Sequence, residues 1–546
     1  MLVPISPPAG MFRNGTQYET SGRWYDGNLI RWENDRMKPI GGWVRVPTTI
    51  TMSGIARGGI AFEDNAGNSY LLIGTNTKLY LFTGGVIFDV TPTGFGGGLV
   101  GSIFGPGYGA GYYGRDVYGL IRTALAFTPD GSGTGAPAPS LIIQASTWQM
   151  DTFGNSVIAV CSSDRNIYQY NPPGTGPSAI TKISGSTVGD PAPTPIAAPT
   201  ALAVMTTNED YLLAIGAGGD NRRIQWPDIG TSTAWTPTTT NSAGGIDLNT
   251  QGKAMAGARV GAQNLVWTDA DAHLIQYVGP PGIYGPVRIG SHCGLVGPRA
   301  WAVTDVAYWM GIGGFFVYNG VVTPMPCDVQ DYVWRLIDWT QAAKIYASTN
   351  TRYNEVIWFF PSVAGTVALD GSVQTRGPDG TVECDSYVIY NYKQGVWYFG
   401  IHTTMARTTW IDRDVYPFPG AVGPNGVLYQ HDQPDYRNDT LPRAGTVRIK
   451  SGFNEIQNGD QIAYVTMMIP DLMRDDGATL VQANVISAFT PDGPATQQTI
   501  DLTPNAEGYV PLRMVGRQFA LEVVNVSDGD WSLGKPRLEV RAGGGR

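Results

Sequence analysis

Hydrophobic and polar residues alternate with a period of two in short stretches along much of this chain, which is the pattern of half-buried β-strands. Each stretch leads into a polar turn and then into a second strand that carries bulky aromatic residues. The pattern occurs at 71–82, 157–170, 265–277, 306–318 and 387–397, and in a weaker form at 211–226. We interpret these segments as copies of one β-hairpin.

Successive hairpins begin roughly 40–85 residues apart, a spacing that fits propeller blades with loop insertions. We therefore predict an all-β protein built around a β-propeller of about six blades. The alternative is a long irregular β-sandwich with unrelated hairpins, because the Trp-Asp ending repeated in many propellers is absent. The ring could also close with strands from both ends of the chain.

Changes in the pattern divide the chain into three parts. Residues 1–54 precede the first hairpin, and we expect them to join either a C-terminal platform or the propeller edge. Residues 55–435 hold the hairpins and form the predicted propeller. Alternating strands at 446–450, 461–468, 519–526 and 537–541 predict a separate C-terminal β-sandwich at 436–546.

A glycine-rich segment at 93–139 interrupts the propeller pattern. Its glycines alternate with aromatic residues, which predicts a long mobile loop with aromatic contacts. The aromatic residues of this candidate partner-contact loop are Phe95, Phe104, Tyr108, Tyr112 and Tyr113.

One amphipathic helix is predicted at 328–346, with Asp328 as its N-cap. Val329, Val333, Leu336 and Ile337 recur at helical spacing and form one apolar stripe. The helix could pack across a blade of its own chain, or it could be an interface element in an oligomer. The sequence leaves both interpretations open.

Composition narrows the class of protein. Charged residues make up 15% of the chain, against about 25% in an average protein, and the net charge is −9 with a pI near 5.0. No global basic field therefore attracts nucleic acid. The N-terminus lacks the features of a secretory signal, and no stretch has the length of a membrane helix. The four cysteines lie far apart, and we expect free thiols in a reducing cytoplasm: Cys161, Cys293, Cys327 and Cys384.

The sequence contains no group of residues whose spacing is typical of a catalytic, metal-binding or cofactor-binding site. The four histidines include no HxxxH or HxH pair, and no Gly-x-Ser-x-Gly elbow is present. Acidic residues do occur two apart, but such pairs beside turns are usually solvated. The pairs are Asp269 with Asp271, Glu383 with Asp385, Asp412 with Asp414, and Asp528 with Asp530. We predict that the protein is not an enzyme.

Several motifs resemble a family of tailed-phage structural proteins. They include GTQYETSGRWYDGNLIRW at 15–32, KPIGGW at 38–43, WQMDTFG at 148–154 and RIQW at 223–226. Further matches are CGLVG at 293–297, YWMG at 308–311, FFVYNG at 315–320, EVIWFFP at 355–361 and WSLG at 531–534. The organisation resembles the tail nozzle of short-tailed phages, also called the tail hub or packaged-DNA stabilisation protein.

The resemblance implies a propeller body with a β-rich platform, assembled as a homohexamer below the portal and its adaptor protein. Such a ring encloses and gates the DNA-ejection channel, anchors tail fibres or spikes, and lets viral DNA pass without sequence-specific binding. The protein would be assembled in the host bacterial cytoplasm and would lie in the virion tail, with no cofactor. The glycine-rich loop is then the candidate gate, and the helix the candidate subunit interface.

Two alternatives belong to other classes. One is a carbohydrate-binding or carbohydrate-cleaving propeller tail protein that acts on host surface glycans, which would need carboxylates or an aromatic platform at one end of the propeller. The other is an extracellular propeller adhesin, against which the missing secretory signal argues.

Overall fold

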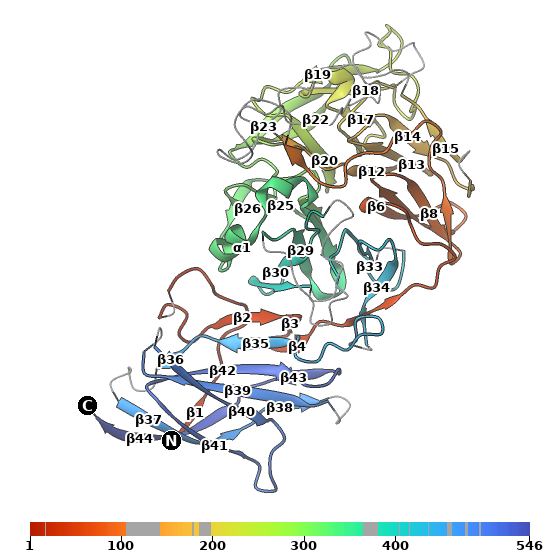
Figure 1. The fold of residues 1–546 in the computed structure, drawn as a ribbon. Coiled ribbons are helices and arrows are strands. Elements are labelled where there is room, and N and C mark those ends of the chain that lie inside the picture. The colour runs from red at the N-terminus through yellow and green to blue at the C-terminus, as the bar shows by residue number, and fades with distance from the viewer. Residues whose placement is uncertain are drawn as a thin grey trace, which may run out of the picture.

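The protein is elongated, with a large β-propeller at one end and a smaller β-structure, the platform, at the other (Figure 1). The computed structural model describes residues 1–546 except 17, 105–141, 177–178, 185–197, 364–379, 403–404, 414, 435, 456–460, 475–478, 491–492 and 546. Strands dominate the described residues, and the prediction of an all-β propeller with a C-terminal β-domain is confirmed.

The propeller has seven four-stranded antiparallel blades among the described residues, one more than the sequence predicted. Blade 1 consists of β6 Ala56–Glu63, β7 Ser69–Thr75, β8 Leu79–Thr83 and β9 Val86–Asp89, and blade 2 consists of β12 Trp148–Phe153, β13 Ser156–Cys161, β14 Ile167–Tyr170 and β15 Ile180–Lys182. Blade 3 consists of β16 Ala203–Thr206, β17 Leu212–Ile215, β18 Arg223–Trp226 and β19 Gly244–Asp247, and blade 4 consists of β20 Ala254–Val260, β21 Gln263–Thr268, β22 Asp271–Gly279 and β23 Ile283–Ser291. Blades 5 to 7 are β24 Trp301–Val303, β25 Ala307–Gly311, β26 Gly314–Tyr318 and β27 Val322–Met325; β28 Tyr346–Asn350, β29 Glu355–Phe360, β30 Ser386–Asn391 and β31 Val396–Ile401; and β32 Thr409–Ile411, β33 Gly420–Val422, β34 Leu428–Gln433 and β5 Gly42–Arg45.

Blade 7 closes the ring with strands from distant parts of the chain. Its outer strand β5 belongs to the N-terminal segment and pairs with β34, where Tyr429 lies opposite Arg45. The innermost strands of neighbouring blades contact one another around a full circle, from β6 through β12, β16, β20, β24 and β28 to β32 and back to β6. The sequence pattern missed this blade because its strands are only three to six residues long, and its outer strand β5 lies far from the other three, which are at 409–433. That the ring could close with strands from distant parts of the chain was anticipated.

The hairpins found in the sequence are mostly the two middle strands of a blade. β7 with β8, β13 with β14, β17 with β18, β21 with β22, and β25 with β26 occupy the expected segments. In blade 6 the segment 387–397 instead joins β30 to the outer strand β31, because the connection between β29 and β30 spans 361–385.

Long connections are concentrated on one face of the propeller, the insertion face. Since strands alternate in direction, turns between second and third strands share a face with the links from one blade to the next. The four longest connections in the ring, 90–147, 183–202, 326–345 and 361–385, all begin and end on this face. The other face carries the shorter turns between first and second strands, together with the links between third and outer strands.

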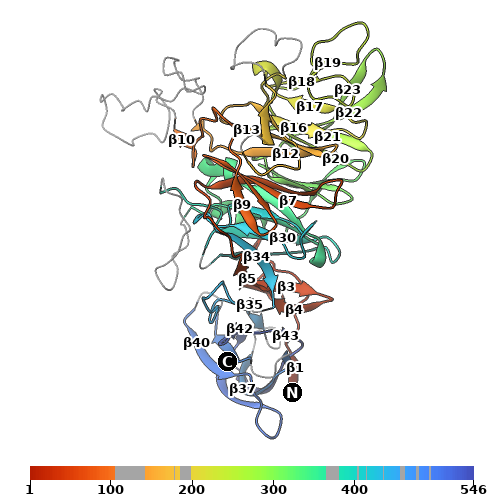
Figure 2. The same cartoon turned by 90° about the vertical axis from the view of Figure 1, so that its right-hand side faces the viewer.

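The platform consists of three sheets, and both chain termini lie in it (Figure 2). The first sheet has the order β1 Leu2–Pro4, β44 Arg537–Gly545, β37 Gln461–Ile469 and β41 Val510–Gly516. The second has the order β2 Trp24–Asn28, β35 Arg448–Ser451, β42 Gln518–Asn525, β39 Val481–Ala488 and β40 Ala495–Asp501, with β36 Asn454–Glu455 beside β42. The third has the order β3 Ile30–Glu33, β4 Arg36–Pro39, β43 Trp531–Leu533 and β38 Leu472–Arg474. Each of these sheets contains a strand from residues 1–54, and the next strand of that segment, β5, belongs to the propeller.

Platform and propeller share one hydrophobic core. A single cluster of buried side chains extends from blades 4 to 7 into the platform. Strand β2 lies beside β31, the outer strand of blade 6. The Met11 backbone N–H donates to the Trp397 carbonyl at 2.7 Å, and the Ile401 N–H donates to Oδ1 of Asn28 at 2.8 Å. The outer edge of blade 6 is therefore covered by the N-terminal segment.

A buried ion cluster fixes this joint. Arg31 on β3 donates Nε to Glu355 on β29 at 3.0 Å and Nη1 to Asp432 on β34 at 2.8 Å. All three side chains are at most 3% exposed, and the Arg31 guanidinium stacks 3.6 Å from the centroid of the Tyr353 ring. Asn350 donates to both carboxylates. One arginine therefore connects the N-terminal segment to two blades.

Replacing Arg31 with methionine should destabilise the protein strongly. Above pH 7, where Glu355 is ionised, two buried carboxylates would lose their cation, and breaking a buried ion pair costs about 3–5 kcal/mol. The measurement is the free energy of unfolding in urea. Arg36→Met on the exposed side of the same hairpin is the matched control, expected to change stability by less than about 0.5 kcal/mol. Equal unfolding midpoints for the two variants would contradict the role of Arg31.

The joint should also respond to pH through Glu355. Burial raises the pKa of Glu355 to about 7, the Arg31 cation opposes this shift, and the neighbouring Asp432 carboxylate adds to it. Between the unfolded value near 4.5 and pH 7, the folded state holds a proton that the unfolded state releases. The contribution of this group to stability is therefore complete below pH 4.5 and is lost as the pH rises through 7.

Glu355→Gln removes this titration and provides the test. The stability penalty of the substitution should shrink between pH 5 and pH 8, by up to about 3 kcal/mol at 1.36 kcal/mol per pKa unit. Urea unfolding of both proteins at the two pH values measures the change. A penalty that stays constant or grows with pH would show that Glu355 is ionised throughout.

Candidate functional site: the propeller axis and the insertion face

The helix in the structure is shorter than the helix that the sequence predicts at 328–346. α1 covers Gln330–Leu336, and a 3-10 helix, η3, follows at Trp339–Lys344. Between them Ile337 is extended, and the Asp338 N–H donates to the Pro361 carbonyl beside blade 6. This backbone bond ends the α-helix where the periodic pattern continued.

Asp328 does not cap α1, whose N-cap is Val329. The Asp328 carboxylate instead accepts from Arg23 at 2.9 Å, and its carbonyl accepts from the Arg13 and Asn14 N–H groups. The N-terminal segment therefore takes the groups that the helix was expected to use.

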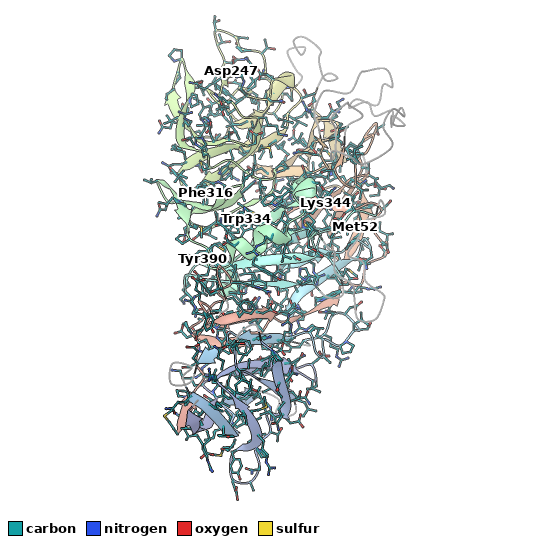
Figure 3. All side chains as sticks on the ribbon, turned by 60° about the vertical axis from the view of Figure 1, so that its left-hand side comes forward. Met52, Asp247, Phe316, Trp334, Lys344 and Tyr390 are labelled. Atoms are coloured by element: carbon teal, nitrogen blue, oxygen red, sulfur yellow. The ribbon has the colours of Figure 1, made fainter. Side chains whose placement is uncertain are left out.

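The apolar stripe of α1 packs inside its own chain. Val329, Val333 and Ile337 are at most 1% exposed, and Leu336 is half-buried against the same core. Figure 3 shows Trp334 of α1 and Lys344 of η3 within the propeller. A subunit contact through this helix stays a prediction, and it would have to use the exposed Asp331 and Arg335 rather than the stripe.

Of the five aromatic residues predicted to form the loop, one has a described side chain. Phe95 packs against Trp148 and Tyr168 of blade 2, with ring centroids 5.2 and 6.4 Å away. Phe104 lies in β10 Ile103–Phe104, which pairs with β11 Ile142–Ile143, and its side chain is outside the described residues. Tyr108, Tyr112 and Tyr113 also lie outside them.

The ends of this connection are held near the propeller axis. Arg57 on the inner strand β6 donates Nη2 to the Val100 carbonyl at 2.6 Å. The Ser102 N–H donates to Oε1 of Gln341, and Nε2 of Gln341 donates back to the Ser102 carbonyl, both at 2.8 Å. The side-chain amide of Gln149 on β12 donates to the Pro298 carbonyl, in the link between blades 4 and 5, at 2.6 Å. Side chains and backbone groups therefore span the axis between blades.

Glu383, one of the candidate acids, lies in a buried ion cluster at this axis. Arg57 donates to both its carboxylate oxygens, at 2.6 and 2.8 Å, and Lys344 donates Nζ at 2.9 Å. The three side chains are at most 3% exposed. Asp385 is also buried and accepts from the Ser362 N–H and hydroxyl at 2.9 and 2.8 Å. Both acids are therefore engaged in internal contacts.

Two of the other acidic pairs are also bound to the fold where they are described. Asp412 accepts from the Thr349 hydroxyl and the Thr351 N–H at 2.8 and 3.0 Å, and Asp414 lies outside the described residues. Asp528 accepts from the Arg443 N–H at 2.7 Å. Asp530 lines a groove at the joint between platform and propeller.

Asp269 and Asp271 line an open groove of about 930 Å³ on the insertion face. The groove crosses blades 3, 4 and 5, and we name it the blade 3–5 groove. Its charged and polar walls include Arg222, Thr250, Arg288 and His292. The sequence pattern pointed to the two aspartates but missed the other residues, because only the closed ring brings them together.

The remaining chemical groups are those of an ordinary protein interior. All four cysteines are free, as predicted, and all four are also buried. Burial raises the pKa of Cys293 to about 11. Within the described residues, no three His, Cys, Asp or Glu side chains are grouped so that they could hold a metal ion. None of the described helices has the length and apolar character needed to cross a membrane.

Comparison with known proteins gives no family. No family model matches the chain, and no curated protein sequence is similar to it. A solved structure of an inactive virginiamycin B lyase from Staphylococcus aureus is 7% identical, with a TM-score of 0.39, and the match covers 70% of this chain and 97% of that one. The Pan2 WD40 domain of Neurospora crassa is 10% identical, with a TM-score of 0.35, and the match covers 73% of this chain and 96% of that one. The exo-β-1,3-galactanase of Phanerochaete chrysosporium is 9% identical, with a TM-score of 0.27, and the match covers 92% of this chain and 100% of that one. Such values carry no information on function.

The buried and the open acidic residues should behave differently when neutralised. Glu383→Gln removes the buried carboxylate charge that Arg57 and Lys344 share, so we expect a loss of about 3–5 kcal/mol in the free energy of unfolding. Asp269→Asn keeps an oxygen that can accept from the Lys253 N–H, and its effect should stay below about 0.5 kcal/mol. Thermal or urea unfolding of the two variants makes the comparison. A Glu383→Gln protein as stable as the wild type would contradict the structural role of the ion cluster.

Proposed function

We propose that this protein is a structural component of a phage virion, a subunit of the tail nozzle that encloses the DNA-ejection channel. The observation that carries the proposal is where the motifs of the resemblance lie. Arg31 in the motif at 15–32 forms its ion pair with Glu355 in the motif at 355–361. β43, from the motif at 531–534, joins the same sheet as β3 and β4. Segments far apart in the sequence thus meet at one joint.

The joint supports a mechanical role. A nozzle subunit must transmit load between neighbouring tail proteins without hinging, and a shared core with buried ion pairs resists such motion. In this chain the N-terminal segment supplies strands to all three platform sheets and to blade 7. Platform and propeller therefore have no flexible linker between them at this end of the chain.

The charge distribution agrees with a conduit that does not grip DNA. Residues 55–435 contain 28 acidic and 19 basic side chains, whereas the other two parts together contain 17 of each. The net negative charge thus belongs to the predicted propeller. Each phosphate neutralised by a protein cation adds affinity through counterion release, so a protein body with a net negative charge would hold DNA weakly.

The enzymatic alternative is not supported by the acids at the axis. Glu383 and Asp385 are buried and satisfied by Arg57, Lys344 and Ser362. A glycosidase needs two carboxylates that reach the substrate. We therefore place any glycan contact elsewhere on the propeller.

Imaging of purified virions tests the proposal. We expect a sixfold ring of this protein beneath the portal adaptor. Quantitative mass spectrometry should give a copy number per virion that matches the six subunits of this ring. Particles assembled with Arg31→Met should lack the ring or leak DNA, whereas Arg36→Met particles should be normal. Finding the protein only at fibre tips, or not in the virion, would refute the nozzle assignment.

A further inference from the structure

The blade 3–5 groove has the size of a ligand site. Its volume of about 930 Å³ lies within the roughly 300–1,000 Å³ of small-molecule pockets. Turns between second and third strands and links between blades form its walls, so it opens on the insertion face. No group of the buried ion clusters at the axis or the joint takes part in it.

Two arginines on its walls have donors to spare. Among the described residues, Nη1 of Arg222 makes one hydrogen bond, a long one of 3.4 Å to the Thr250 carbonyl. Nη1 of Arg288 lies 4.0 Å from Oδ2 of Asp271, and this side chain is 57% exposed. A guanidinium carries five N–H donors in a planar fork that suits carboxylates and phosphates. The lining of the groove therefore offers two guanidinium groups to an anionic ligand.

The aspartates add acceptors beside these cations. Asp271 is 7% exposed and its Oδ2 accepts from the Thr250 hydroxyl at 2.9 Å. Oδ1 of Asp269 accepts from the Lys253 N–H at 2.8 Å, and the residue is otherwise exposed. A carboxylate has lone pairs for several donors. A ligand that fits must therefore supply hydroxyl donors as well as negative charge.

The wall of the groove is held in an unfavourable backbone shape. His292 has φ of 59°, a left-handed conformation that costs a non-glycine residue about 1–2 kcal/mol. Next along the wall, Gly294 passes so close to blade 4 that a Cβ there would lie 2.2 Å from the Asp269 carbonyl carbon. Strain of this kind persists only where the surrounding structure enforces it.

We propose that this groove binds an acidic saccharide, a sugar chain that carries carboxylate or phosphate groups among its hydroxyls. The described lining contains no Trp, Tyr or Phe, whereas single-stranded nucleic acid binds by stacking its bases on aromatic rings. A chain of carboxylates without hydroxyls would meet Asp269 and Asp271 unfavourably. The net charge of −9 repels polyanions in general, so binding would have to come from the groove itself.

Calorimetric titration of the full chain tests the proposal. The probes are hexagalacturonate for carboxylates and a glycerol-phosphate oligomer that carries sugars for phosphates. At least one should bind, and the double variant Arg222→Gln/Arg288→Gln should weaken that binding about tenfold, which is about 1.4 kcal/mol. The affected probe identifies the anionic group.

Arg223→Gln is the matched control. Arg223 adjoins Arg222 in the sequence but pairs with Asp247 at 3.4 Å and does not line the groove. Asp247 lies at the end of the propeller far from the platform (Figure 3). This variant should bind the probes with the same affinity as the wild type. All variants should have the unfolding temperature of the wild type because the substituted side chains are exposed.

Four results would overturn the proposal. They are no binding of either acidic probe at millimolar concentration, equal binding of neutral maltohexaose, tighter binding of hexathymidylate or hexaglutamate, and a double variant that binds as well as the wild type. Because the proteins in this test need not be assembled into particles, its outcome is independent of the nozzle assignment.

Discussion

The ion cluster around Arg31 is the interaction on which the arrangement of this molecule depends. A lone arginine in the protein interior is costly, and here the cost is offset by two carboxylates that come from different blades. None of the three groups is stable at this depth without the others. The N-terminal segment is therefore held against blades 6 and 7 by the same interaction that fixes the platform to the propeller.

Ring closure follows from the same segment. Immediately after β3 and β4, the chain enters the propeller as β5 and completes blade 7. A propeller that closes with strands from distant parts of the chain cannot open at that blade without breaking the β5–β34 ladder. Here the closing strand is also anchored in the platform, so that separating the two structures and opening the ring become one process.

Local sequence patterns were sufficient for the repeated part of the fold. Alternation at 71–82 or 265–277 predicts a hairpin because both strands and their turn are contiguous. Blade 7 was missed since its strands at 409–433 are short and its outer strand β5 comes from the N-terminal segment. The helix was overextended since a backbone bond from Asp338 to Pro361 ends it. The free cysteines were predicted correctly from their spacing, whereas the ion clusters of Arg31 and Arg57 could not be, because their partners lie more than 300 residues away.

The acidic pairs show most clearly why the site could not be derived from the sequence. Asp269 with Asp271 and Glu383 with Asp385 share one spacing, and both lie where the second strand of a blade connects to the third. In blade 6, Arg57 from blade 1 and Lys344 from the preceding link surround Glu383 and exclude water. In blade 4, Asp269 accepts a hydrogen bond from the N–H of Lys253, and the groove beside it stays open. Whether a carboxylate at this position is structural or available to a ligand is therefore decided by the neighbouring blades, and the sequence around it carries no trace of the choice.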